Sequence, residues 1–216
     1  MAGKDLNKKE LRRQRRQREK TQRERAALRK RAMIWGGGVF VTILIGVVLF
    51  QQLNPANQVG TVVLDQGNQH IGSVDEPHVP YNTTPPTSGP HMSGLWQWGI
   101  SEEPIADEWQ VHNLEDGGVI IQYDCPDDSC PDLKAELTDF VTQLLADSSL
   151  RNPNSGTVHL ILAPYSGFRN TPASSGQRIA LTAWTRILYL DTVDRQKMME
   201  FIRAYLNDDH HARGAG

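Results

Sequence analysis

The second half of the chain alternates apolar runs with segments of helical periodicity. The run at 119–123 follows two glycines and ends at an Asp/Pro cluster, which predicts a buried strand. Apolar residues then recur every three to four positions from Leu133 to Leu145, which predicts a helix that begins at Asp132 or in the turn before it. The regular part of the chain therefore begins with a strand and an amphipathic helix.

Two further apolar runs and a second helical pattern follow. Residues 157–163 and 179–190 predict strands, the second of which is interrupted near Thr185. Residues 193–206 predict a closing helix with its apolar side chains directed at the core. The polar residues that could cap this helix are Asp191 and Thr192.

These elements define the predicted fold class, an α/β protein with one compact sandwich in the order β-α-β-β-α. The predicted core covers residues 111–207, and residues 208–216 follow it as a frayed tail. Prolines and glycines are frequent in residues 67–110, and the prolines exclude a helix and a central strand there. This segment also carries three tryptophans, which favour an ordered loop over a flexible stalk, at Trp96, Trp98 and Trp109.

An uncharged apolar run separates two oppositely charged parts of the chain. Residues 1–32 hold 14 Lys/Arg and 4 Asp/Glu, a net charge of +10, whereas the remainder carries a net charge of −12. Between them lie 18 uncharged residues, 33–50, which would span about 27 Å as a helix, close to one bilayer core. We therefore predict a single transmembrane signal anchor at 33–53, followed by a linker and a first strand region at 54–66.

The basic residues beside this run predict its orientation. Arg29, Lys30 and Arg31 adjoin it, and no Lys or Arg follows until Lys134. The positive-inside rule then places the N-terminus in the cytoplasm and the folded part outside the cell membrane. A cleaved signal peptide is the alternative, but no clear small-residue cleavage site follows the run. We expect the basic arm to contact anionic lipid at the cytoplasmic face rather than nucleic acid, because it lacks aromatic residues for base stacking.

Several motifs of the chain resemble those of a known family. Residues 85–91 read Pro-Pro-Thr-Ser-Gly-Pro-His, residues 111–115 read Val-His-Asn-Leu-Glu, and Gly-Gly-Val follows at 117–119. With these motifs the chain resembles domain of unknown function 3105 over roughly residues 59–206. The resemblance implies a bacterial protein with one membrane anchor before the domain and no assigned activity. The family motif has a second histidine directly after the glutamate, where this chain has Asp116.

Histidines gather before and beside the first predicted strand, at positions 70, 78, 91 and 112. The candidate metal ligands, with the strongest first, are His91, His112, Met92, His78, Glu115 and Asp116. Imidazole suits copper, zinc and iron, and a thioether favours Cu(I), so copper or another transition metal is the expected cofactor. The two carboxylates lie three and four residues after His112 and could ligate the metal or orient the imidazole. Alternatively, each histidine satisfies backbone carbonyls within an irregular loop.

The chain contains two cysteines, Cys125 and Cys130, in the sequence Cys-Pro-Asp-Asp-Ser-Cys. Outside the cytoplasm such a pair, with a turn between its members, most simply forms a structural disulfide. The pair also follows a predicted strand and precedes a predicted helix, as redox-active pairs do. Its C-x₄-C spacing and neighbouring aspartates favour the structural role over the redox one. Metal ligation is a third alternative.

Two functional hypotheses follow from these features. The first is a non-enzymatic binding or assembly module that holds a partner, such as a membrane protein, through the tryptophan-bearing loop. The second is a copper-type domain that binds metal or transfers electrons through His91, His112 and their neighbours. The chain has no P-loop, no G-x-S-x-G elbow and no G-x-G-x-x-G motif, so the sequence gives no support for an enzyme of these classes.

Overall fold

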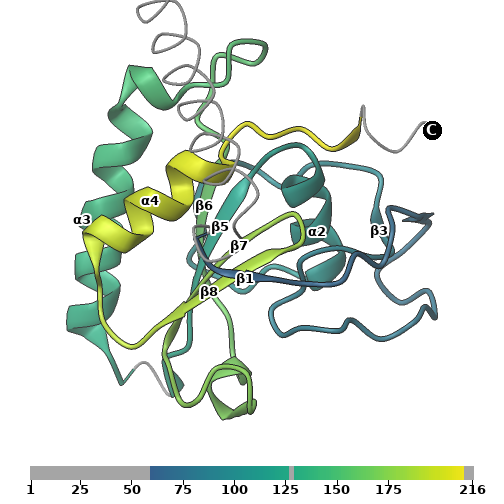
Figure 1. Ribbon diagram of the computed structural model, residues 1–216, viewed down its shortest axis with the longest axis horizontal. Coiled ribbons are helices and arrows are strands. Elements are labelled where there is room, and N and C mark those ends of the chain that lie inside the picture. The colour runs from purple at the N-terminus through teal and green to yellow at the C-terminus, as the bar shows by residue number, and fades with distance from the viewer. Residues whose placement is uncertain (1–58, 127–128, 212–216) are drawn as a thin grey trace, which may run out of the picture. The chain divides into compact units, whose positions relative to one another are not determined.

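A computed structural model of the chain describes residues 59–126 and 129–211. Within these residues, six strands form one mixed sheet (Figure 1). In the order in which they lie side by side, the strands are β1 (Thr61–Val62), β8 (Arg186–Leu190), β7 (Ile179–Ala183), β5 (Val119–Tyr123), β6 (Leu160–Pro164) and β4 (Gly99–Ile100). All residues of β5 and β7 are buried, which places the core at the middle of the sheet.

The strands of this sheet run in both directions. β6 is parallel to β5 and to β4, whereas β7 is antiparallel to β5 and to β8. β1 adds to the far edge, antiparallel to β8. A parallel pair such as β5 and β6 needs a crossover connection, and helix α3 (Pro131–Ala146) provides it. The antiparallel pair β7 and β8 needs only the two-residue turn Trp184–Thr185, in which Thr185 adopts a φ of 57°.

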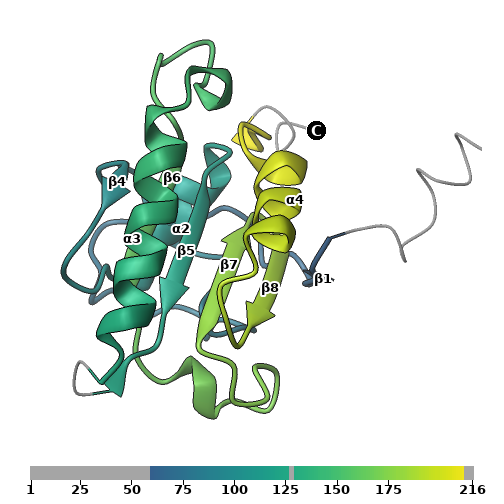
Figure 2. The ribbon, with the colours of Figure 1, turned by 90° about the vertical axis from the view of Figure 1, so that its left-hand side faces the viewer.

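Helices cover both faces of the sheet. α3 and α4 (Arg195–Tyr205) lie side by side over one face, and the shorter α2 (Asp107–Glu115) lies behind the other (Figure 2). Each face of the sheet has its own apolar core, and alternate side chains of β5 point into one or the other. Val119 and Ile121 pack in the apolar cluster with α3 and α4, whereas Ile120 packs with Leu114 of α2.

The structure confirms the central strand and the amphipathic helix that the apolar pattern predicts. β5 spans the predicted run, and α3 buries Leu133, Leu137 and Leu144 on the predicted face. The run at 179–190 forms two strands instead of one, because the chain reverses at the interruption expected near Thr185.

The caps predicted for the closing helix are wrong. α4 begins at Arg195, and its N-cap is Asp194 rather than Asp191 or Thr192. The Asp194 carboxylate accepts a hydrogen bond of 3.1 Å from the backbone N–H of Lys197. This bond satisfies one of the backbone donors that a helix N-terminus leaves free.

Helix α2 is missing from the predicted order of elements. The helix buries mostly polar side chains, among them Gln110, His112, Asn113 and Glu115. Because no apolar stripe marks such a helix, periodicity of hydrophobic residues does not reveal it. From this helix onward the observed order is α-β-α-β-β-β-α, which replaces the predicted β-α-β-β-α.

The proline-rich segment before α2 forms a long loop that contains a second, two-stranded sheet. β2 (His70–Ile71) pairs in parallel with β3 (His91–Met92), and His70 lies opposite His91. Residues 85–91 are buried. The backbone N–H of Thr185 donates to the Thr87 carbonyl at 3.0 Å, and the Tyr189 hydroxyl donates to the Thr84 carbonyl at 2.7 Å. These bonds tie the loop to the main sheet.

The transmembrane part of the predicted fold class needs correction. No helix within residues 59–126 and 129–211 is long and apolar enough to cross a membrane. The anchor predicted at 33–53 and its basic flank, Arg29 to Arg31, lie outside these residues. Within the described residues, the architecture that the structure supports is a mixed sheet with helices on both faces.

Candidate metal site

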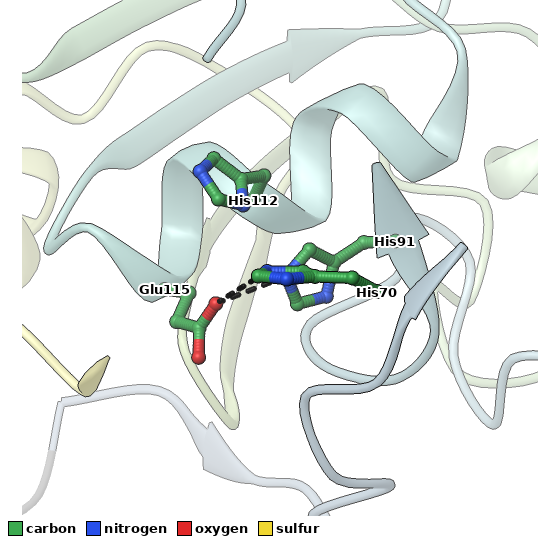
Figure 3. Close-up of side chains that lie close together, drawn as sticks. All are labelled: His70, His91, His112 and Glu115. Carbon is green, nitrogen blue, oxygen red and sulfur yellow. Dashed lines mark hydrogen bonds and ion pairs between the residues drawn. The ribbon is translucent and has the colours of Figure 1, made fainter. Parts of the chain in front are cut away.

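Three histidines and a glutamate converge beside helix α2. His70, His91, His112 and Glu115 each place one potential ligand atom within 4.8 Å of the others (Figure 3). The three imidazole centroids lie 5.0 to 5.5 Å apart. His91, His112 and Glu115 are buried, whereas the His70 side chain is 46% exposed. Solvent therefore reaches the cluster on the His70 side.

Two local structures bring these side chains together. The parallel register of β2 and β3 places His70 opposite His91. On α2, a spacing of three residues puts His112 and Glu115 on the same face of the helix. Figure 3 shows this face turned toward the two strands. Residues that are far apart in the sequence therefore meet at one point.

The ring of His91 is fixed at both nitrogens. Its Nδ1 lies 2.7 Å from the carbonyl oxygen of Gly89, which can only accept, so Nδ1 carries a hydrogen. Its Nε2 lies 2.9 Å from Oε2 of Glu115. Burial is the main cause that lowers the pKa of His91, so the neutral ring is favoured. In this neutral form Nε2 directs a lone pair at the carboxylate.

His112 holds a buried nitrogen that has no hydrogen-bond partner among the described residues. This atom is Nδ1, and the side chain is 8% exposed. Burial lowers the pKa of His112, and the nearby Asp116 carboxylate opposes that effect only in part. A buried polar atom without a partner costs about 1–3 kcal/mol. The ring is therefore placed where a bound ligand would be favourable.

A second group of potential ligands overlaps the first. His112, Asp116 and His211 also place ligand atoms within 4.8 Å of one another. Nδ1 of His211 lies 2.7 Å from Oδ1 of Asp116, and its Nε2 lies 3.3 Å from Oε2 of Glu115. The segment expected to be a frayed tail reaches this place because the backbone N–H of His210 donates to the Glu115 carbonyl at 2.9 Å.

Two of the ligands predicted from the sequence, His78 and Met92, do not belong to either group. Nε2 of His78 lies 3.3 Å from Oε1 of Glu108, and its Nδ1 lies 2.8 Å from the Val79 carbonyl oxygen. Met92 follows His91 in β3, and neighbouring side chains of a strand point to opposite faces. Of the predicted set, the structure brings together His91, His112 and Glu115, with Asp116 in the second group.

The ligand set predicted from the sequence lacks two residues of these groups, His70 and His211. His70 stands among glycines and polar residues, and only the pairing of two very short strands shows that it faces His91. His211 belongs to a segment that carries no apolar pattern. The consecutive histidines His210 and His211 are the signal that could have pointed to this segment.

The disulfide predicted from the sequence is confirmed. Cys125 and Cys130 are bonded, with their Cα atoms 5.7 Å apart. Both residues pack against the apolar cluster between the sheet and the helices α3 and α4. The bond therefore closes the connection between β5 and α3.

The tryptophan-bearing loop lines an exposed groove. Leu95, Trp96 and Ile100 are 48%, 37% and 36% exposed. Together with Trp98 and Trp109 they border a cavity of about 910 Å³. The role of this loop in binding a partner stays a prediction.

The fold and the cluster define a mixed α/β domain with a buried histidine–carboxylate site. A family model described as "Protein of unknown function (DUF3105)" matches residues 73–215. The chain therefore belongs to this family, which confirms the resemblance found in the sequence motifs. No curated protein and no solved structure matches the chain. The family description names no activity, so the site itself must supply the argument for function.

Proposed function

We propose that the chain is a metal-binding domain that holds a divalent first-row transition-metal ion between His70, His91, His112 and Glu115. The observation that supports this most strongly is the distance of 2.9 Å between Nε2 of His91 and Oε2 of Glu115. Two atoms that both present lone pairs repel each other at this distance unless a proton or a cation lies between them.

The orientation of His91 suits a metal ligand. The Gly89 carbonyl keeps the hydrogen on Nδ1 and leaves Nε2 as the acceptor. Imidazoles that ligate metals are commonly held in this way by a backbone carbonyl at the other nitrogen. Zinc lies about 2.0–2.2 Å from nitrogen and oxygen ligands, so two ligands of one ion lie roughly 3–3.5 Å apart. The separation of Nε2 and Oε2 is close to this range.

The balance of buried charge also supports a cation. Glu115 is 1% exposed, and its Oε1 accepts a hydrogen bond of 2.8 Å from Nδ2 of Asn68. The lowered pKa values of His91 and His112 disfavour their charged forms, so these rings compensate a buried carboxylate poorly. A divalent ion would place positive charge beside this carboxylate, which also has the half-exposed His70 and His211 as neighbours, at 3.9 and 3.3 Å. It would also offset the cost of burying the unpartnered ring nitrogen of His112.

The ligand atoms of the proposed site indicate which class of metal ion it binds. Imidazole nitrogen with one carboxylate oxygen suits Zn²⁺, Cu²⁺ and Fe²⁺, whereas Mg²⁺ and Ca²⁺ prefer oxygen ligands throughout. A Cu(I) site built on Met92 loses its basis, because no thioether belongs to the proposed set. Cu²⁺ stands highest in the general order of affinities and Zn²⁺ has no redox chemistry, so these two ions are the best probes.

Calorimetric titration of the full chain, stripped of metal by a chelator, tests the proposal. We expect stoichiometric binding of Zn²⁺ or Cu²⁺, no response to Mg²⁺, and binding weakened about tenfold or more in His91→Ala and His112→Ala. His78→Ala is the matched control, because this histidine is also largely buried but pairs with Glu108. Equal affinities of His91→Ala and His78→Ala would overturn the proposal. The absence of stoichiometric binding to the folded wild-type chain would also overturn it.

A further inference from the structure

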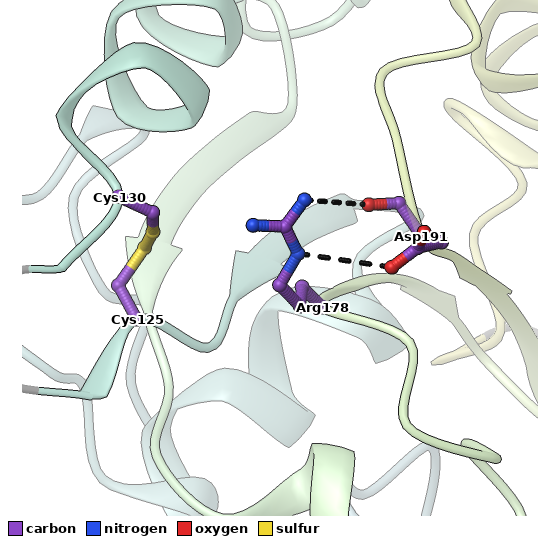
Figure 4. The surroundings of a disulfide bond; sticks show 4 residues. All are labelled: Cys125, Cys130, Arg178 and Asp191. Atoms are coloured by element: carbon purple, nitrogen blue, oxygen red, sulfur yellow. Dashed lines mark hydrogen bonds and ion pairs between the residues drawn. A yellow bond between two sulfur atoms is a disulfide. The ribbon is translucent and has the colours of Figure 1, made fainter.

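The disulfide lies between a central strand and the helix that follows it. Cys125 comes two residues after β5 ends, and Cys130 directly precedes α3 (Figure 4). The helix α3 connects β5 to its parallel neighbour β6, so the three elements form a βαβ unit. Cysteine pairs with C-x-x-C spacing that exchange disulfides are found at such a junction, and the present pair shares this position although four residues separate its members.

Cys130 occupies a position that favours a thiolate. It is the N-cap residue of α3, a helix of 16 residues, and its side chain, which is held in the disulfide, makes no capping hydrogen bond. An N-cap side chain lies next to the backbone N–H groups of the first turn, where the helix also carries a partial positive charge. Once the disulfide is reduced, the Cys130 thiolate can accept hydrogen bonds from these groups.

A cavity gives access to the same residue. It has a volume of about 360 Å³, and Cys130 and Pro131 line one side of it. Arg178 and Thr192 belong to the same lining, which does not include Cys125. Cys130 is therefore the cysteine of the pair that borders this cavity.

Arg178 brings a positive charge to this cavity. Its carbonyl oxygen accepts a hydrogen bond of 2.9 Å from the backbone N–H of Asp124, which directly precedes Cys125. Figure 4 shows its guanidinium turned toward Asp191, at 3.7 Å from Nε to Oδ1. The cavity lining also includes the acidic residues Asp132 and Glu136. The N-terminus of α3 is therefore the main support of the thiolate, and Arg178, which pairs with Asp191, offsets part of the negative charge of this lining.

We propose that Cys125 and Cys130 form a thiol–disulfide exchange site for a disulfide carried by a protein or peptide. The Cys130 thiolate attacks one sulfur of this disulfide and forms a mixed disulfide, and the partner's other sulfur leaves as a thiolate that takes a proton from water. Cys125, after losing its proton to water, attacks Sγ of Cys130, restores the intramolecular bond and releases the partner's second thiolate. The partner gains two electrons and the pair loses two. A dithiol donor then reduces the pair again. This activity is independent of the proposed metal site.

Reduction of insulin by dithiothreitol in the presence of EDTA, followed by light scattering of the released chain, tests this proposal. We expect the wild-type full chain to accelerate the reaction about threefold or more over dithiothreitol alone. Cys125→Ser and Cys130→Ser should abolish the acceleration, and Arg178→Gln, which keeps both cysteines, should reduce it. A purely structural disulfide predicts no acceleration, so a smaller effect of the folded wild-type chain would overturn the proposal.

The reactivity of the remaining thiol in each single-cysteine variant shows which sulfur attacks the partner's disulfide. After circular dichroism has shown that both variants fold, their thiols are reacted with 5,5′-dithiobis(2-nitrobenzoate). We expect the thiol of Cys125→Ser to react about tenfold faster or more than that of Cys130→Ser, because Cys130 is the residue at the helix N-cap and the cavity. Equal rates, or a faster reaction of Cys130→Ser, would overturn the assignment of Cys130 as the nucleophile.

Discussion

The side chains of His91 and Glu115 meet at 2.9 Å although they belong to different elements of the fold. The pairing of β2 with β3 fixes His91, and the last turn of α2 fixes Glu115. Both side chains are buried, so their contact belongs to the interior of the domain and is not a surface ion pair. A substitution at this contact can therefore change the stability of the fold as well as the affinity for metal, and the two quantities must be measured separately.

Glu115→Gln is expected to weaken Zn²⁺ binding about tenfold or more and to leave the metal-free protein at least as stable as the wild type, because it removes a buried charge. The amide keeps the size of the carboxylate, can donate a hydrogen bond to Nε2 of His91, and can still accept one from Asn68. Calorimetry measures the affinity, and urea unfolding in EDTA measures the stability. An unchanged affinity would contradict the inclusion of Glu115 among the ligands.

Bound metal is expected to stabilise the fold, because the ligands converge only in the folded state. At a free Zn²⁺ concentration a hundredfold above Kd, the gain in the free energy of unfolding is about 2.7 kcal/mol. The urea midpoint should rise when Zn²⁺ is added and return when EDTA removes it. His91→Ala serves as the control and should show a smaller rise, about 1.4 kcal/mol or less at the same Zn²⁺ concentration if its affinity is tenfold or more lower. A rise of the same size in this variant would indicate binding elsewhere.

His211 lies at the exposed side of the site. Its side chain is 39% exposed, and its Nδ1 is 2.7 Å from Oδ1 of Asp116. His211→Ala should therefore cost less affinity than His91→Ala, but it should speed the release of Zn²⁺ to a chelator several-fold. Stopped-flow mixing of the loaded protein with a chromogenic chelator measures this rate. The prediction fails if release is as slow from His211→Ala as from the wild type.

Asp107 is expected to make stability depend on pH. Burial raises the pKa of its carboxyl group from 3.8 to about 6, although a hydrogen bond from the Tyr165 hydroxyl opposes the shift. Because the folded state holds this proton more tightly than the unfolded state, stability falls as the pH rises through this interval. A shift of this size corresponds to about 3 kcal/mol above pH 6.

Asp107→Asn should therefore stabilise the protein at pH 7.5 and change little near pH 4. The amide is uncharged at both values and can still accept the hydrogen bond from Tyr165. Urea unfolding at the two pH values measures the difference. An equal change in the free energy of unfolding at both pH values would show that ionisation of Asp107 does not cause the pH dependence.

Gly118 has no room for a side chain. A Cβ at this position would lie 2.5 Å from the carbonyl oxygen of Asn113 and 2.7 Å from the ring of Trp98. Gly118→Ala is expected to lower the free energy of unfolding by about 1–3 kcal/mol, as overpacking of a core does. Gly72→Ala is the control, because its Cβ would meet only the flexible end of the Glu76 side chain, at 3.3 Å. Similar losses in both variants, measured by urea unfolding, would contradict the steric explanation.

The sheet and two of its helices could be predicted because they bury apolar side chains. The strand is marked by the apolar run from Val119 to Tyr123, in which Gln122 is the one polar residue. The helix is marked by apolar residues that recur with the helical period, at Leu133, Leu137 and Leu144. Helix α2 could not be predicted in this way, because its buried face includes His112, Asn113 and Glu115. The polar side chains that form the candidate site therefore also remove the apolar pattern by which this helix could be predicted.

The candidate ligands could be predicted from the sequence only where they lie close together along the chain. His112 and Glu115 lie three residues apart, and this spacing suggests a shared helix face once a helix is assumed. The meeting of His70 with His91 depends on a two-residue strand pairing, and the position of His211 depends on a hydrogen bond from His210 to α2. Neither contact leaves a periodic pattern in the sequence.

X-ray diffraction at the zinc absorption edge, from crystals of the Zn²⁺-loaded chain, tests the proposed metal site most directly. We predict an anomalous peak about 2.0–2.2 Å from Nε2 of His91 and from a carboxylate oxygen of Glu115, with His70 and His112 completing the ligand set. Bound zinc located only at other residues, such as Asp116 and His211, would contradict the proposed site.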